Sequence, residues 1–161
     1  MTKTIAQESF TKELFTILEE TFETHSGVYL DKGTSLLTTL DQVSAEEASI
    51  PVGNGCATIA AQVEHIIFYI EVLELILMGQ GTGKPDWKDI WNRVSTVTSD
   101  EWDEIRDRLK ATYRRIKAML HGVENWEQND AIGGSMAIVV HTAYHLGELR
   151  QALCSVGRSP R

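Results

Sequence analysis

Residues 59–77, IAAQVEHIIFYIEVLELIL, carry the clearest structural signal in the chain. Their apolar side chains recur every three or four positions, which is the repeat of one face of an α-helix. Glu64, Glu71 and Glu74 fall largely away from that face. We therefore predict a long amphipathic helix here, ended by the glycines and the proline of residues 79–85. The apolar face consists of Ile59, Val63, Ile66, Ile70, Leu73 and Leu77.

The same repeat predicts three further long helices. One covers residues 10–22 and ends before Gly27. Another begins at Thr98 and Glu101, which have capping-box spacing, and continues to residue 120. The last runs from about 131 to 156 and ends at Gly157. Shorter helices are predicted within 36–43 and 86–94, and the capping-box spacing of Ser44 and Glu47 predicts a turn.

No segment shows the alternation of a β-strand over a useful length. Four long amphipathic helices bury their apolar faces most simply against one another. The sequence therefore predicts an all-α protein, a four-helix bundle with a short accessory helix. The length of 161 residues suits a single domain, 1–161.

Composition indicates a globular protein, with 42% apolar residues and a formal net charge of −8. An acidic surface repels phosphate groups, so we expect neither nucleic acid nor a membrane as the main partner. The apolar run 66–78 is interrupted by glutamates and is short for a membrane span. No basic start followed by an apolar run is present, so we expect a cytoplasmic protein with reduced Cys56 and Cys154. We expect Cys154 to be packed.

Two histidines stand four residues apart in HTAYHLGELRQ, residues 141–151. On a helix His141 and His145 share a face, and Glu148 continues it. His65 lies midway along the helix predicted over 59–77. Neutral imidazole is a common metal ligand, and three rings from two helices leave coordination positions open for a substrate. The alternative is that the histidines are packed or solvated without a metal. The HExxH protease motif is absent, because Thr142 follows His141.

These segments resemble a known family. HTAYHLGELRQAL, residues 141–153, is similar to the last-helix signature of the DinB/YfiT-like family of four-helix-bundle, metal-dependent proteins. ATIAAQVEH, residues 57–65, is similar to the family's second-helix signature, in which a histidine follows a Thr-Ile pair. The resemblance covers nearly the whole chain, in helix order and in signature order.

The resemblance implies that His65, His141 and His145 bind a divalent metal ion, nickel or zinc first. It also implies a homodimer and a small-molecule substrate. Characterised members transfer low-molecular-weight thiols, such as bacillithiol, mycothiol or glutathione, to electrophiles. The expected function is therefore that of a metal-dependent thiol S-transferase. A metal-dependent hydrolase, and a non-catalytic stress-related or ligand-binding bundle, remain the alternatives.

Several residues near the histidines keep more than one interpretation. The family often has Gln where this chain has Glu148. That carboxylate could be a fourth ligand, an acceptor that orients a histidine N–H, a general base, or a partner for Arg or Lys. We favour the orienting or basic role. Gln62 and Tyr69 share the face of His65 and are expected to line a pocket. Cys56 lies in a loop, and no His–Cys spacing supports a nucleophilic role for it.

Overall fold

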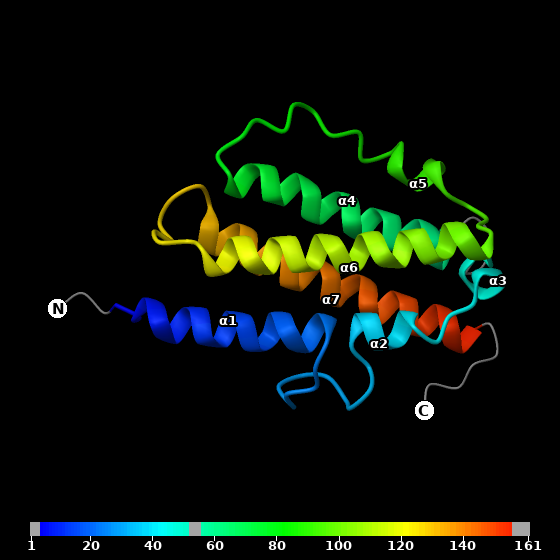
Figure 1. Ribbon diagram of the computed structural model, residues 1–161, viewed down its shortest axis with the longest axis horizontal. Coiled ribbons are helices and arrows are strands. Elements are labelled where there is room, and N and C mark those ends of the chain that lie inside the picture. The colour runs from blue at the N-terminus through cyan, green and yellow to red at the C-terminus, as the bar shows by residue number, and fades with distance from the viewer. Residues whose placement is uncertain (1–3, 52–55, 156–161) are drawn as a thin grey trace.

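The computed structural model describes residues 4–51 and 56–155 (Figure 1). Within these ranges the chain forms seven helices and no strand, apart from one isolated bridge between Pro51 and Thr58. The all-α prediction is confirmed. The helices are α1 (Gln7–Phe22), α2 (Leu36–Leu40), α3 (Ala45–Ala48), α4 (Ile59–Leu77), α5 (Ile90–Arg93), α6 (Ser99–His121) and α7 (Ala131–Ser155).

The four longest helices, α1, α4, α6 and α7, run along the long axis of the molecule (Figure 1). Helix α4 packs against both α6 and α7, and α1 packs against α7. Helix α2 continues roughly in line with α1, and α3 lies at the end where α4 and α6 begin. The segment after α4 turns back along that helix to reach α5. This arrangement places the middle of α4 beside the middle of α7, where Tyr69 meets His141.

Side-chain caps fix the starts of three helices. Thr98 Oγ1 accepts a hydrogen bond from the Glu101 amide, and the Glu101 carboxylate accepts one from the Thr98 amide. Ser44 and Glu47 form the same reciprocal pair at α3. Thr58 Oγ1 accepts from the Ala61 amide at α4. The two predicted capping boxes are therefore confirmed, and each satisfies amides that the first helical turn leaves unpaired.

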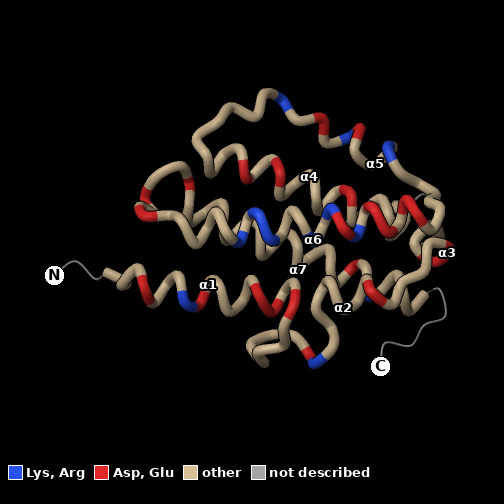
Figure 2. Tube along the Cα trace, viewed as in Figure 1, with Lys and Arg blue, Asp and Glu red and all other residues tan. Residues whose placement is uncertain are grey.

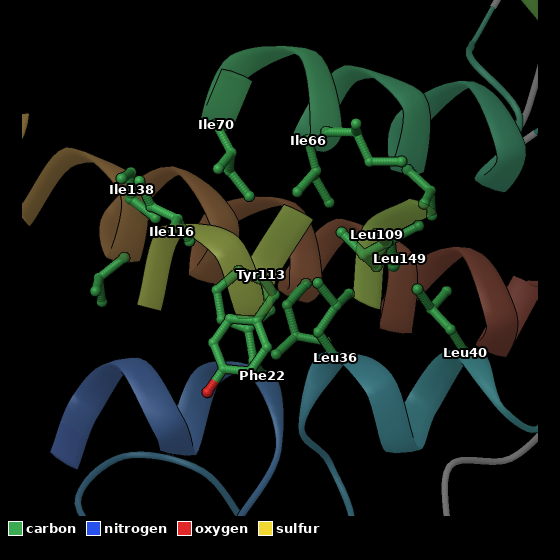
Figure 3. Close-up of a cluster of buried hydrophobic side chains, with 14 of the residues drawn as sticks. Phe22, Leu36, Leu40, Ile66, Ile70, Leu109, Tyr113, Ile116, Ile138 and Leu149 are labelled. Carbon is green, nitrogen blue, oxygen red and sulfur yellow. The ribbon is translucent and has the colours of Figure 1, made fainter. Parts of the chain in front are cut away.

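The core lies where the apolar faces of the long helices meet (Figure 3). Phe22 of α1 stacks on Tyr113 of α6, with ring centroids 4.3 Å apart. Trp102 is buried and donates its indole N–H to the Val43 carbonyl over 2.7 Å, which ties α6 to the segment between α2 and α3. Burial of the ring, together with a hydrogen bond for its N–H, stabilises the packing of α6 against that segment.

The structure corrects one expectation and adds detail to two others. Cys154 is exposed, because it points away from the α7 face that packs in the core. Glu64, expected to lie away from the apolar face of α4, is buried there and forms a bidentate pair with Arg108 of α6, with N–O distances of 2.9 and 3.0 Å. The helix predicted within 86–94 is only the four-residue α5, and Trp87 lies outside it.

The predicted end of the last helix at Gly157 lies outside the described residues. None of the helices in the described ranges is long and apolar enough to cross a membrane.

Candidate metal centre

The three predicted histidines come together at the contact between α4 and α7. The ring centroid of His65 lies 4.9 Å from that of His141 and 4.8 Å from that of His145. The two α7 rings are 4.5 Å apart. Each ring offers one nitrogen such that the three nitrogens lie within 4.8 Å of one another. Three imidazoles at this spacing can hold a metal ion.

Burial keeps these imidazoles neutral. His65 and His145 are buried, and His141 is half-buried. Loss of hydration, together with the nearby His145, lowers the pKa of His65 to about 4. Loss of hydration and the other two imidazoles lower the pKa of His141 to about 3. Burial also lowers the pKa of His145, although Glu148 opposes the shift. Near neutral pH all three rings are therefore in the form that binds metals.

The nitrogen atoms have the hydrogen-bond pattern of a metal centre. His145 Nδ1 lies 2.8 Å from Glu148 Oε2. With Nδ1–H donating to the carboxylate, the lone pair of Nε2 is free for a ligand bond. Within the described residues, His65 Nδ1 and His141 Nε2 are buried and have no hydrogen-bond partner. Unpaired buried polar atoms are costly, and a bound cation would relieve that cost. The donor set, all neutral imidazole, suits nickel or zinc.

The carboxylate of Glu148 contacts the His145 ring. It lies one turn beyond His145, with 41% of its side chain exposed. No described Arg or Lys forms an ion pair with it. Its contact with Nδ1 is that of a group that holds the imidazole in one tautomer.

Aromatic rings surround the histidines. Trp91 of α5 stacks on His65 at 4.1 Å, and Tyr69 of α4 stacks on His141 at 3.5 Å. Tyr144 meets His145 edge to face at 5.1 Å. Tyr69 was predicted beside the site from its helical position. The contacts of Trp91 and Tyr144 were not predicted: Trp91 arrives from a segment without periodicity, and Tyr144 lies about 100° around the helix from the histidine face.

Gln62, the other predicted pocket residue, is buried one turn before His65. Its Oε1 atom has no hydrogen-bond partner among the described residues, and neither has the hydroxyl of Thr142 beside His141. A cavity of about 310 Å³ lies elsewhere, between α4, α6 and residues 93–97, with Glu64 and Arg108 in its wall. None of the three histidines lines it. The pocket role of Gln62 and Tyr69 stays a prediction.

Cys56 and the chain's two other histidines have no described contact with the three clustered histidines. Cys56 is exposed in the segment before α4. His121, the last residue of α6, is stacked on Phe15 of α1, with ring centroids 3.8 Å apart. His25 lies in the loop after α1 and is exposed. The cluster is therefore made of the three histidines whose spacing indicated it.

Comparison with protein families, with curated proteins and with solved structures finds no match for this chain.

Proposed function

We propose that this protein is a metal-dependent enzyme of the DinB/YfiT-like kind, in which His65, His141 and His145 hold a divalent cation, nickel or zinc. The observation that carries the proposal is the convergence of three mostly buried imidazoles from two helices within 4.8 Å. Two of their buried nitrogens have no hydrogen-bond partner in the described part of the chain. The family resemblance adds a signature in each of those two helices.

The proposed reaction is S-transfer from a low-molecular-weight thiol to a small electrophile. A divalent ion in this site would lower the pKa of a thiol or water bound to it. The thiol sulfur forms a bond to the electrophilic carbon, the thiol proton goes to a base, and the leaving group departs with its electron pair. Glu148, whose carboxylate lies 2.8 Å from His145 Nδ1, would orient that ring and serve as the base. The hydrolytic alternative differs in using water instead of the thiol.

We extend the proposal to the whole molecule: α1, α4, α6 and α7 form the family's four-helix bundle, and the protein works as a cytoplasmic homodimer. The support for the dimer is a charge-free surface on α7. Residues 131–147 contain no Asp, Glu, Lys or Arg, and Ile132, Met136 and Val140, each one turn apart, are 43%, 50% and 65% exposed. Charged residues, by contrast, lie along α1 and α6 (Figure 2). Two copies with net charge −8 would meet with least repulsion at the α7 surface.

Metal analysis of protein purified without a histidine tag tests the centre. We expect close to one nickel or zinc ion per chain, and loss of the metal in His141→Ala. His25→Ala is the matched control, because that histidine is exposed and outside the cluster. Metal retained when His65, His141 and His145 are all replaced by alanine would contradict the proposal.

The reaction is tested with monochlorobimane and a panel of thiols, with and without a chelator. We expect thiol conjugation that chelation abolishes and added zinc or nickel restores. Conjugation unaffected by metal removal would rule out the proposed mechanism. Ester hydrolysis without conjugation would favour the hydrolase.

A further inference from the structure

The cavity of about 310 Å³ beside α4 is separate from the histidine cluster and has a buried ion pair in its wall. Glu64 is the acidic member of that pair, with 8% of its side chain exposed, and Arg108 of α6 is the basic member, with 53% exposed. Burying a carboxylate on a mostly apolar helix costs free energy that such a pair seldom recovers in full, so stability alone does not account for Glu64. Each Glu64 oxygen accepts one hydrogen bond from Arg108, whereas a carboxylate can accept about four, which leaves acceptor capacity for a ligand in the cavity.

The other charges around the cavity leave two carboxylates without a cationic partner. Arg93, the second guanidinium in the wall, is paired with Asp89 at 2.8 Å. Glu101 and Glu104 also line the cavity, and no described Lys or Arg forms an ion pair with either of them. The Glu101 carboxylate accepts hydrogen bonds from the amide and hydroxyl of Thr98, which are uncharged. The wall of the cavity therefore carries an excess of negative charge.

Nearby positive charges do not cancel this excess. The N-terminus of α6 contributes about half an elementary charge from its backbone dipoles, which is less than the two carboxylates carry. Lys88 has no ion pair among the described residues, but it precedes α5 and is not part of the cavity wall. An ion at the histidine cluster would also lie outside, because none of the three histidines lines the cavity. A carboxylate or phosphate group here would be repelled by Glu101 and Glu104, whereas an ammonium group would be attracted.

Apolar side chains complete the wall of the cavity: Val94, Val97 and Ile105 lie beside its charged groups. Apolar surface with a few converging polar groups is the usual composition of a small-molecule site, in which the polar groups orient the ligand. We propose that this cavity is a further binding site, for a small organic cation that carries a primary amine on a short aliphatic chain. The ammonium group would bind to Glu64 and Glu104, and the chain would contact the apolar side chains. This binding is independent of the proposed function, because it uses no residue of the metal centre.

The test compares three probes with the same carbon chain: pentylamine, 1-pentanol and pentanoate. Isothermal titration calorimetry is carried out with the full chain, freed of metal by a chelator, in about 0.15 M salt, which screens non-specific attraction to the acidic surface. We expect pentylamine to bind at least about fivefold more tightly than pentanol, and pentanoate to bind most weakly. Glu104→Gln should weaken pentylamine binding about threefold to tenfold, as the loss of one charged acceptor predicts.

Matched variants keep the result specific. Glu13→Gln makes the same change in net charge at an exposed position of α1 and should alter pentylamine binding less than about twofold. His141→Ala should bind pentylamine as the parent does, because that histidine does not line the cavity. Glu64→Gln should weaken binding at least as much as Glu104→Gln. If loss of the buried pair unfolds this variant, the exposed Glu104 position decides the test.

The outcomes separate this inference from the metal centre. Pentanoate binding as tight as that of pentylamine, no detectable pentylamine binding, or equal losses in Glu104→Gln and Glu13→Gln would overturn the inference even if zinc binds normally. Loss of binding in His141→Ala would place the amine at the histidines and would also overturn it. Pentylamine binding by a protein that takes up no zinc would support the inference and reject the metal centre.

Discussion

Glu20 is fully buried, and its carboxylate accepts hydrogen bonds from four successive backbone amides. The donors are the amides of Ser26, Gly27, Val28 and Tyr29, at N–O distances of 2.7–3.1 Å. Gly27 has a φ of +76°, a conformation that glycine adopts without strain and that lets the amides turn toward one acceptor. One side chain of α1 therefore fixes the start of the loop that leads to α2.

Replacing this carboxylate should destabilise the protein. In Glu20→Gln an amide N–H₂ would face backbone N–H groups, and we expect the free energy of unfolding to fall by about 2 kcal/mol, the size of a few hydrogen bonds to a charged acceptor. Urea unfolding followed by circular dichroism measures the change. Glu13→Gln, at an exposed position of the same helix, is the control and should differ little from the parent.

The difference in unfolding free energy between the parent and Glu20→Gln should depend on pH. Burial raises the pKa of Glu20, but the four backbone hydrogen bonds outweigh it and the net pKa is lowered. A carboxyl whose folded pKa is depressed stabilises the fold above its unfolded pKa of about 4.3, and that stabilisation is lost as pH falls through the folded value. The gap between parent and Glu20→Gln should therefore be full at pH 7 and close on acidification below about pH 4. A gap that widens in acid would show that another group is responsible.

Glu148 should affect zinc affinity through its contact with His145 and have little effect on folding stability. Removing the acceptor of the Nδ1 proton frees the ring to rotate and to change tautomer, so Glu148→Ala should weaken zinc binding roughly tenfold to 100-fold. The unfolding midpoint of the metal-free protein should change little, because Glu148 is partly exposed. Competition with a chromogenic chelator measures the affinity, with Glu104→Ala on α6 as control. Unchanged affinity would exclude the orienting role.

Helix α6 depends on its reciprocal cap. Thr98→Ala removes the acceptor for the Glu101 amide and should cost about 1 kcal/mol of folding free energy. Thr11→Ala is the matched control: its hydroxyl only donates to a carbonyl of its own helix, and alanine is the better helix former there. We expect that control to be neutral or slightly stabilising. Equal losses in the two variants would indicate that the cap contributes nothing specific.

The helices and the histidines were predictable because both depend on local periodicity. The apolar repeats of α4 and α7 placed His65, His141 and His145 on inward faces, and the Thr98 and Ser44 caps follow a four-residue pattern. The remaining features depend on contacts between distant segments. Glu64 is buried only because Arg108 reaches it from α6, and Trp91 meets His65 only because an irregular segment turns back along α4. No repeat in the sequence encodes either contact.

At the scale of the whole molecule, the proposed dimer should be lost when the α7 surface becomes charged. Met136→Lys places a cation in the centre of that surface and should shift sedimentation toward the monomer at micromolar concentration. Met78→Lys is a close control, because Met78 lies at the end of α4 and is 49% exposed, against 50% for Met136. Sedimentation of the parent as a monomer, or equal effects of the two variants, would contradict the proposed dimer.

The stack of Trp91 on His65 gives the protein an internal optical reporter. An indole 4.1 Å from the imidazole lies close enough to sense directly the ion that His65 would hold under the proposed function. Nickel or copper, with partly filled d shells, should quench its emission, whereas zinc, with a filled d shell, should leave it bright. Nickel should cause no such quenching in Trp91→Phe, although Trp87, Trp102 and Trp126 still fluoresce. Metal exchange could then be followed in real time, without any added label.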